Sequence, residues 1–249
     1  KEGLKKKVTS YSQLQRFLGE VFTREYNKTV NLNSELVNKH KIPGAVSLAR
    51  KTLADAMRSN PNEEFFGLTG NGVDVSVYKA LKRLSKFKWN DEDKRFVIRG
   101  KEMKNFFASY KEILRNYSDG ITYYDLQNIL VSPPFGLRKG VIPLYLSLFD
   151  KALEHPINYY LDGEYVASLD GVHYDLLAKQ PKNIYLQYTE IDKSKILFLN
   201  SLGELLKIKG EANISSVLTA FYKWRKKVPE YTKNTQELST EAKKLLIFL

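Results

Sequence analysis

The chain has 249 residues, enough to bury a sizeable core, and it has no cysteine, which excludes disulfides, thiolate zinc sites and cysteine nucleophiles. Its 40 lysines and arginines against 28 acidic residues give a formal net charge of +12, which is typical of a partner for nucleic acid or another anionic surface but also of lysine-rich solvated surface. No apolar run approaches the roughly 18 residues of a membrane span, so we expect no membrane partner.

The two ends of the sequence lead to two expectations, one about cellular location and one about the length of the full protein. The basic start, residues 1–7, lacks the apolar core of a signal peptide, and together with the absence of cysteine this predicts a cytoplasmic location. The first residue is not Met, and the last five residues, Leu245–Leu249, are apolar and would normally be packed. We therefore expect a segment of a longer protein.

Two amphipathic helices are predicted in the first sixty residues. Apolar residues at helical spacing predict the first from Ser10 to Tyr26, with Ser10 or Ser12 available as N-cap. The second is predicted from Pro43 to Arg58, because proline is tolerated in the first turn of a helix. The polar stretch between them, residues 27–41, has room for a short helical turn.

A glycine-rich stretch, Phe65 to Val75, precedes a third helix. It has no Gly-Lys-Ser/Thr sequence and no apolar strand before it, so a connecting loop is favoured over a phosphate-binding loop. The helix beginning at Asp74 presents a row of outward cations: Lys79, Lys82, Arg83 and Lys86. Contact with phosphates is one interpretation of this row, and a solvated face is the favoured one.

The middle of the chain is predicted to contain two helices joined by a tight turn. After a strand at Arg95–Arg99 and a helix at Lys101–Tyr117, Thr122 is a suitable N-cap for the first of them. Ser132-Pro-Pro-Phe-Gly136 ends that helix, because the residue before proline disfavours helix and glycine takes positive φ. The second helix, Arg138 to Leu153, is apolar nearly all round, which indicates a core helix rather than a DNA-reading one.

A β-hairpin follows these helices. Ile157–Leu161 and Glu164–Ser168 alternate apolar and polar residues around Asp162-Gly163, a strong two-residue turn signal. Two helices and a hairpin are the order of a winged helix-turn-helix, with the hairpin as the wing. A helix at Gly171–Lys179, a strand at Asn183–Thr189 and a helix at Lys193–Lys207 are predicted next.

The tail is predicted to be helical from Ile214 to Val228, with a last helix capped by Ser239 or Thr240. Altogether we predict a mainly α fold with a small β component, a helical bundle around a winged-helix-like centre. Its predicted parts are an N-terminal helical region at 1–95, a winged-helix-like region at 96–192 and a truncated C-terminal helical region at 193–249.

No constellation typical of catalysis or metal binding is present. The three histidines lie far apart, and none has a second ligand at metal spacing. His173 with Asp175 and Asp170 could in principle hold a divalent ion, but a helix-capping role for Asp170 is the favoured interpretation. There is no Gly-x-Ser-x-Gly elbow, and no spacing singles out an acid/base pair. We therefore expect no catalytic residue, no metal site and no cofactor.

Four short motifs occur in order along most of the chain: Asn33-Ser-Glu-Leu-Val-Asn38, Ser132-Pro-Pro-Phe-Gly-Leu-Arg-Lys-Gly-Val-Ile-Pro143, Tyr160-Leu-Asp-Gly-Glu-Tyr-Val166, and Val228-Pro-Glu-Tyr-Thr-Lys-Asn-Thr235 with Leu238-Ser239. Together they resemble a region of very large bacterial P-loop ATPases associated with anti-phage defence and related nucleic-acid transactions. Because no Walker lysine is present, the resemblance implies a non-catalytic regulatory or docking region, with the motor elsewhere in the protein.

Two functions are therefore expected. The first is a segment of a larger ATPase that engages DNA or RNA, or relays its presence to the motor. Its candidate nucleic-acid-binding residues are Arg138, Lys139, Lys151, Lys223, Arg225, Lys226 and Lys227. The alternative is a protein-interaction module whose winged fold is purely structural and packs on a neighbouring domain or subunit. Whether these basic residues share one exposed face discriminates the two. An enzyme, based only on unpaired carboxylates, is the third option.

Overall fold

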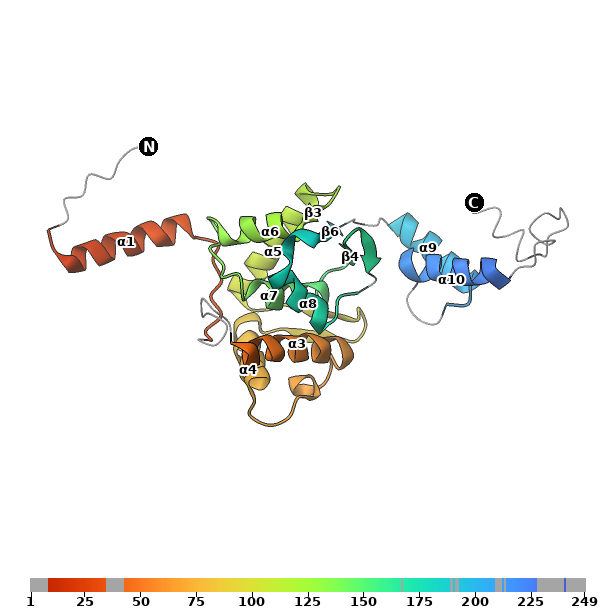
Figure 1. Cartoon of the computed structure of the whole chain (residues 1–249), viewed down its shortest axis with the longest axis horizontal. Coiled ribbons are helices and arrows are strands. Elements are labelled where there is room, and N and C mark those ends of the chain that lie inside the picture. Colours follow the sequence, from red (N-terminus) through yellow and green to blue (C-terminus); the bar gives the residue numbers. More distant parts are fainter. Residues whose placement is uncertain are drawn as a thin grey trace. The chain divides into compact units, whose positions relative to one another are not determined.

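A computed structural model describes residues 9–34, 43–166, 168–188, 193–208 and 214–227, with the single residues 190, 212 and 240. It divides the chain into two compact units, Lys1–Thr189 and Glu190–Leu249. The fold is mainly α with a small β component, as the sequence predicts (Figure 1). Most of the predicted turn near residues 31–38, His40 and the last predicted helix lie outside the described residues.

The bounds of most elements are close to those predicted, but the helix predicted at Arg138–Leu153 spans only Ile142–Asp150, and strands form at Lys88–Asn90 and Ile121–Thr122, where none is predicted. The helices of the first unit are α1 (Tyr11–Glu25), α3 (Gly44–Ser59), α4 (Val73–Ser85), α5 (Lys101–Asn116), α6 (Tyr123–Val131), α7 (Ile142–Asp150) and α8 (Gly171–Lys179), with two 3-10 helices, η1 (Glu64–Gly67) and η2 (Pro181–Asn183). Its strands are β1 (Lys88–Asn90), β2 (Arg95–Val97), β3 (Ile121–Thr122), β4 (Ile157–Leu161), β5 (Glu164–Val166) and β6 (Ile184–Tyr188). The second unit contains α9 (Lys193–Leu205) and α10 (Ile214–Lys227).

Side-chain caps begin three of the helices. Ser10 accepts a hydrogen bond from the backbone N–H of Gln13 at the start of α1, and Thr122 accepts one from Asp125 at the start of α6. Asp170 caps α8, which confirms the capping role predicted for it. These side-chain oxygens satisfy backbone donors that have no partner inside the helix. Pro43 precedes α3 as its N-cap residue, one position before its predicted place in the first turn.

The described residues form two antiparallel sheets. β1 and β2 form a two-stranded sheet in which Trp89 pairs with Phe96, and the sequence had predicted only the second of these strands. The larger sheet has the order β3-β6-β4-β5. The predicted hairpin of β4 and β5 is confirmed: both residues of its turn, Asp162 and Gly163, have positive φ.

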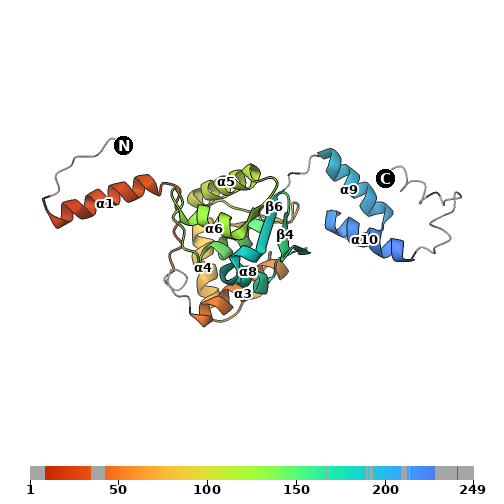
Figure 2. The same cartoon turned by 45° about the horizontal axis from the view of Figure 1, so that its top comes forward.

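The winged-helix centre is not confirmed. β3, which leads into α6, pairs with β6 and not with either strand of the hairpin. β6 comes from beyond α8 and separates β3 from β4, and β4 and β6 lie side by side in Figure 2. The hairpin strand β5 is therefore the edge of a four-stranded sheet, and a helix is inserted between the hairpin and the strand that completes the sheet.

The core of the first unit is continuous across the predicted boundary at residue 95. Phe66 and Phe87, before the boundary, lie 5.7 Å and 5.1 Å in ring-centroid distance from Phe96, after it. α7 forms the centre of this core: each residue from Ile142 to Phe149 is buried. α7 packs against α3 and α8, and its Phe149 lies 5.4 Å from the ring of Phe106 on α5.

Candidate functional site

The helix that follows the tight turn cannot read bases from its own surface. Every side chain of α7 from Ile142 to Phe149 is buried, so none of them is available to reach a base edge in a DNA groove. Its only polar residues within that span, Tyr145 and Ser147, are hydrogen-bonded to the backbone carbonyls of Val30 and Leu144. The prediction that this helix is a core element is confirmed.

The basic residues predicted around α7 lie at its two ends. Arg138 and Lys139 are exposed in the turn that precedes the helix. Lys151 directly follows the helix, is half-buried and lines a small cavity. The nine residues of α7 span about 14 Å at about 1.5 Å per residue, so these three cations do not gather at one place.

The other predicted cations form a cluster of their own in the second unit. Lys223, Arg225, Lys226 and Lys227 are all exposed and occupy the last turns of α10. Cations at this end of a helix offset the negative end of the helix macrodipole, so the cluster has a structural explanation beside the nucleic-acid one. Trp224, in the middle of the cluster, is also exposed.

Comparison of the chain with protein families, with curated proteins and with solved structures gives no match. The resemblance to large bacterial ATPases therefore stays a prediction.

One exposed surface is the apolar stripe of α1, formed by Tyr11, Leu14, Leu18 and Phe22. These side chains are 74%, 40%, 41% and 57% exposed, and no residue of α1 is buried. Their spacing of three and four residues places them on one face of the helix, as the sequence predicts. The structure adds that no described part of the chain covers this face.

The opposite face of α1 carries charges of both signs. Arg16 and Glu20 form an ion pair one turn apart, with 3.4 Å between Nε and Oε1. Near the end of the helix, Arg24 pairs with the adjacent Glu25 at 3.2 Å, and Glu25 itself lies on the side of the apolar stripe, seven residues after Leu18. α1 is thus amphipathic, with a mixed polar face and an uncovered apolar stripe.

The second unit also exposes apolar side chains. α9 and α10 pack on each other with few buried contacts, chiefly at Leu199, Val217 and Gly203. The exposed large apolar side chains of this helical pair are Ile196, Leu197, Phe198, Ile214, Leu218, Tyr222 and Trp224. Helices whose described residues bury so little apolar surface are typical of a segment that packs against another surface.

A broad groove lies between α4, the loop that precedes it and the β1–β2 hairpin. Its volume is about 680 Å³. Its aromatic lining residues are Phe65, Phe66, Tyr78, Phe87 and Trp89, and its basic ones are Lys79, Lys82, Arg83 and Lys88. The sequence pointed to the cations of α4 as a row but not to the groove, because β1 was not predicted and Trp89 could not be placed beside them.

Lys82 is the most enclosed of the groove cations. Its Nζ donates a 2.6 Å hydrogen bond to the carbonyl of Phe87 and lies 4.1 Å from the centre of the Phe87 ring. Burial disfavours the charged form and lowers the pKa of this amine. One of its three N–H donors is used by the carbonyl, and the others remain for a ligand.

A second, smaller cavity of about 150 Å³ lies beside Asp150, at the end of α7. Both oxygens of this carboxyl accept hydrogen bonds from Tyr159 at 2.7 Å, and Oδ2 also accepts one from Tyr174. Burial raises the pKa of Asp150 to about 6, although the two tyrosines and Lys151 favour its charged form. Arg58 lines the same cavity and donates to Ser168 at 3.5 Å. No spacing in the sequence could have predicted this cluster.

A third polar cluster surrounds Asp175, one of the three residues that the sequence offered as possible ligands of a divalent ion. Asp175 is buried and accepts hydrogen bonds or ion pairs from Ser47, Arg50, Lys51 and Lys179, the last at 2.6 Å. Burial opposes the charge of Asp175, but the hydrogen bonds from Lys179 and Ser47 outweigh it and lower its pKa. The cluster ties α3 to α8.

His173 is engaged elsewhere, in the capping box with Asp170 that begins α8. Within the described ranges, no group of three histidine, aspartate or glutamate side chains is arranged to hold a metal ion. None of the helices in that part of the chain combines the length and the apolar content that crossing a bilayer requires.

Proposed function

We propose that this chain is a non-catalytic protein-interaction module of a larger protein, and that it docks by inserting the apolar stripe of α1 into a groove on a neighbouring domain or subunit. The observation that carries the proposal is the exposure of Tyr11, Leu14, Leu18 and Phe22 along one face of a regular helix. In the bacterial ATPases that the sequence resembles, such a module would sit beside the motor as a regulatory or docking part.

Covering the apolar stripe would stabilise α1 itself. An isolated helix of 15 residues is marginal in water, because nucleation is costly and tertiary packing supplies most helical stability. Full burial of one large apolar side chain contributes roughly 1.5–3 kcal/mol, so covering four of them stabilises both the helix and the complex. Laying an apolar helix face into a groove is a common mode of recognition.

The charges of α1 favour a protein surface over a membrane surface. Helices that lie in a membrane interface are rich in lysine and arginine on their polar face. α1 instead has two basic and two acidic residues, paired as Arg16 with Glu20 and Arg24 with Glu25. The helix therefore has no net charge of its own, which suits the polar rim of a protein interface.

Site-specific photo-crosslinking in the full protein tests this proposal. A photoreactive amino acid at Leu18, on the stripe, should give one defined protein adduct, and the same group at Thr23, on the exposed polar face, should give none. Leu14→Asp should abolish the Leu18 adduct. Equal adducts from both positions, or adducts only with lipid, would contradict the proposal, and an adduct with a second copy would identify the partner as this chain.

Nucleic-acid engagement is the second candidate function, and the basic end of α10 is the observation that favours it. Four cations surround the exposed Trp224 there. An electrophoretic binding assay over a salt series tests it, because neutralised phosphates make affinity fall steeply with salt. Changing Lys223, Arg225, Lys226 and Lys227 to Gln should flatten that dependence, and no binding even at low salt would exclude this candidate.

A further inference from the structure

The groove beside α4 combines cations with a fixed aromatic wall. Phe66 at its base packs edge-on against Tyr78, with 4.9 Å between ring centroids, and stacks on Phe87 at 5.4 Å. Trp89 packs against Phe96 at 5.2 Å and is held at its edge, since its Nε1–H donates to Asp91 at 3.1 Å. Because these rings support one another, the wall is already in place before a ligand arrives.

The backbone of the loop that closes the groove is unusual. Phe65 and Phe66 both have positive φ, 52° and 57°, a region that bulky L-residues rarely adopt. Their packing around Tyr78 holds them there, with Phe65 at 5.2 Å and Phe66 at 4.9 Å. Such strained residues often occur where a binding surface must be shaped in advance.

The cations of the groove have no acidic partner among the described residues. Lys79, Lys82, Arg83 and Lys88 line it, and no carboxylate of the described ranges forms an ion pair with any of them. Three of the four are on α4, at the spacing of one helical face. Their positive charge is therefore available to an anionic ligand.

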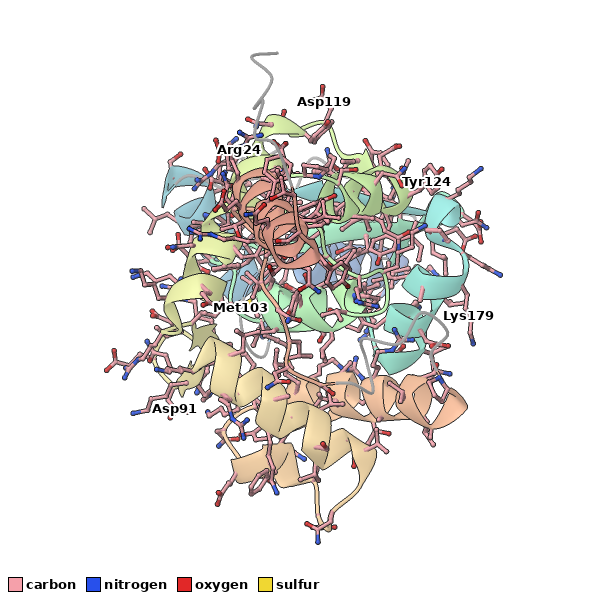
Figure 3. All side chains as sticks on the ribbon, turned by 90° about the vertical axis from the view of Figure 1, so that its left-hand side faces the viewer. Arg24, Asp91, Met103, Asp119, Tyr124 and Lys179 are labelled. Atoms are coloured by element: carbon pink, nitrogen blue, oxygen red, sulfur yellow. The ribbon has the colours of Figure 1, made fainter. Side chains whose placement is uncertain are left out.

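The acidic lining residues lie on other elements. Glu63 and Glu64 belong to the loop before α4. Asp91, labelled in Figure 3, is the first residue of the turn that joins β1 to β2. Asp91 already accepts the indole hydrogen of Trp89. A chain of phosphates would follow the α4 side of the groove, because the acidic loop repels it.

We propose that this groove binds a short run of single-stranded nucleic acid, with phosphates on Lys79, Lys82 and Arg83 and an unpaired base stacked on Trp89. Cationic grooves with aromatic platforms are the usual means of binding unpaired strands, since every base has a flat face. Paired bases are stacked on each other inside a duplex and do not offer that face to a recessed ring. An acidic peptide would use the cations but has no planar group for Trp89.

Single-strand binding in the groove would be a function additional to the docking role of α1, and the fluorescence of Trp89 can report this binding directly. The chain has two tryptophans, so Trp224→Phe leaves Trp89 as the sole source of tryptophan emission. We expect an oligothymidylate of about 12 nucleotides, within the size of one single-strand site, to quench Trp89 emission. A duplex and polyglutamate at matched charge should not quench it.

Paired substitutions then locate the site. Lys79→Gln with Arg83→Gln should weaken binding at least about tenfold and reduce the salt slope by about 1.4, the value for two phosphate contacts on a single strand. Lys104→Gln with Lys182→Gln removes the same charge from exposed positions outside the groove and should leave quenching unchanged. Circular dichroism of each variant confirms that the fold is retained.

Three results would overturn the proposal. Equal quenching by polyglutamate would assign the groove to acidic peptides, and equal loss of affinity in the control variant would show a general charge effect. Binding that persists without quenching, and that is lost only when the α10 cations are changed, would move the nucleic-acid site to the second unit.

Discussion

The carboxyl group of Asp150 is held between two tyrosine hydroxyls at the end of the central helix, beside a cavity that Arg58 and Lys151 also line. Its pKa is raised by burial from 3.8 to about 6, so the folded protein binds a proton there more tightly than the unfolded chain. The stabilising contribution of this proton is fully present below about pH 4 and is lost as pH rises through about 6.

We therefore expect Asp150→Asn to flatten the dependence of unfolding free energy on pH. Two pKa units correspond to at most about 3 kcal/mol, the amount by which the wild-type contribution should fall between about pH 4 and pH 6. Urea unfolding at a series of pH values measures it. Tyr110→Phe is the matched control, because the Tyr110 hydroxyl is buried nearby without a hydrogen-bond partner in the described part of the chain. An unchanged pH slope in the asparagine variant would contradict the assignment.

Two glycines at helices have opposite effects on stability. Gly100 begins α5 against the end of α4, and a Cβ there would overlap the backbone carbonyl of Leu84. Its N–H also donates to the carbonyl of Ser85 at 2.8 Å. Gly19 lies in the middle of α1, where a Cβ would meet no atom within 4 Å. The first glycine is required by packing, whereas the second only weakens its helix.

Gly100→Ala should therefore destabilise the first unit by about 1–3 kcal/mol, as overpacking against fixed backbone does. Gly19→Ala should increase the helicity of α1 by favouring the helical state by about 1 kcal/mol. Denaturant unfolding and far-ultraviolet circular dichroism measure the two effects. A neutral Gly100→Ala would mean that α4 and α5 are free to move apart.

The exposed apolar face of α1 shows what helical periodicity in a sequence predicts and what it does not. The periodicity of residues 10–26 predicts an amphipathic helix, and α1 has that face, but nothing in the described chain covers it. Periodicity identifies a face that prefers burial and does not say what buries it. The docking proposal depends on that distinction.

For the whole molecule, the two units differ in how much core they have. The first has a large contiguous cluster of buried side chains, whereas the described helices of the second bury little beyond Leu199 and Val217. The net charge is spread unevenly along the chain. Residues 43–189 contain 20 basic and 17 acidic residues, so most of the net charge of +12 comes from the segments on either side, residues 1–42 and 190–249. A non-specific polyanion would therefore be attracted mainly by those segments.

The units should unfold separately. Each has one tryptophan, so Trp224→Phe reports on the first unit and Trp89→Phe on the second. We expect the Trp224 signal to change at a lower urea concentration, because less apolar surface is buried around it. Coincident midpoints by both probes would show that the two units unfold as one cooperative body.

Sequence patterns were sufficient to predict the features that depend on neighbouring residues. Helical periodicity and caps located α1, α3, α5, α6 and α8, Asp162-Gly163 set the hairpin, and the apolar character of residues 141–149 marked α7 as core. Each of these signals is local, because it arises from the spacing of side chains along a single element.

What distant residues do together follows from the tertiary structure. β6 enters the sheet between β3 and β4, Tyr159 and Tyr174 converge on Asp150, and Trp89 comes beside the cations of α4. Strand order and side-chain convergence follow from packing across long sequence separations, for which no single-sequence pattern exists. The same packing buries α7, whereas the apolar stripe of α1 and the groove beside α4 are open to solvent in the described part of the chain.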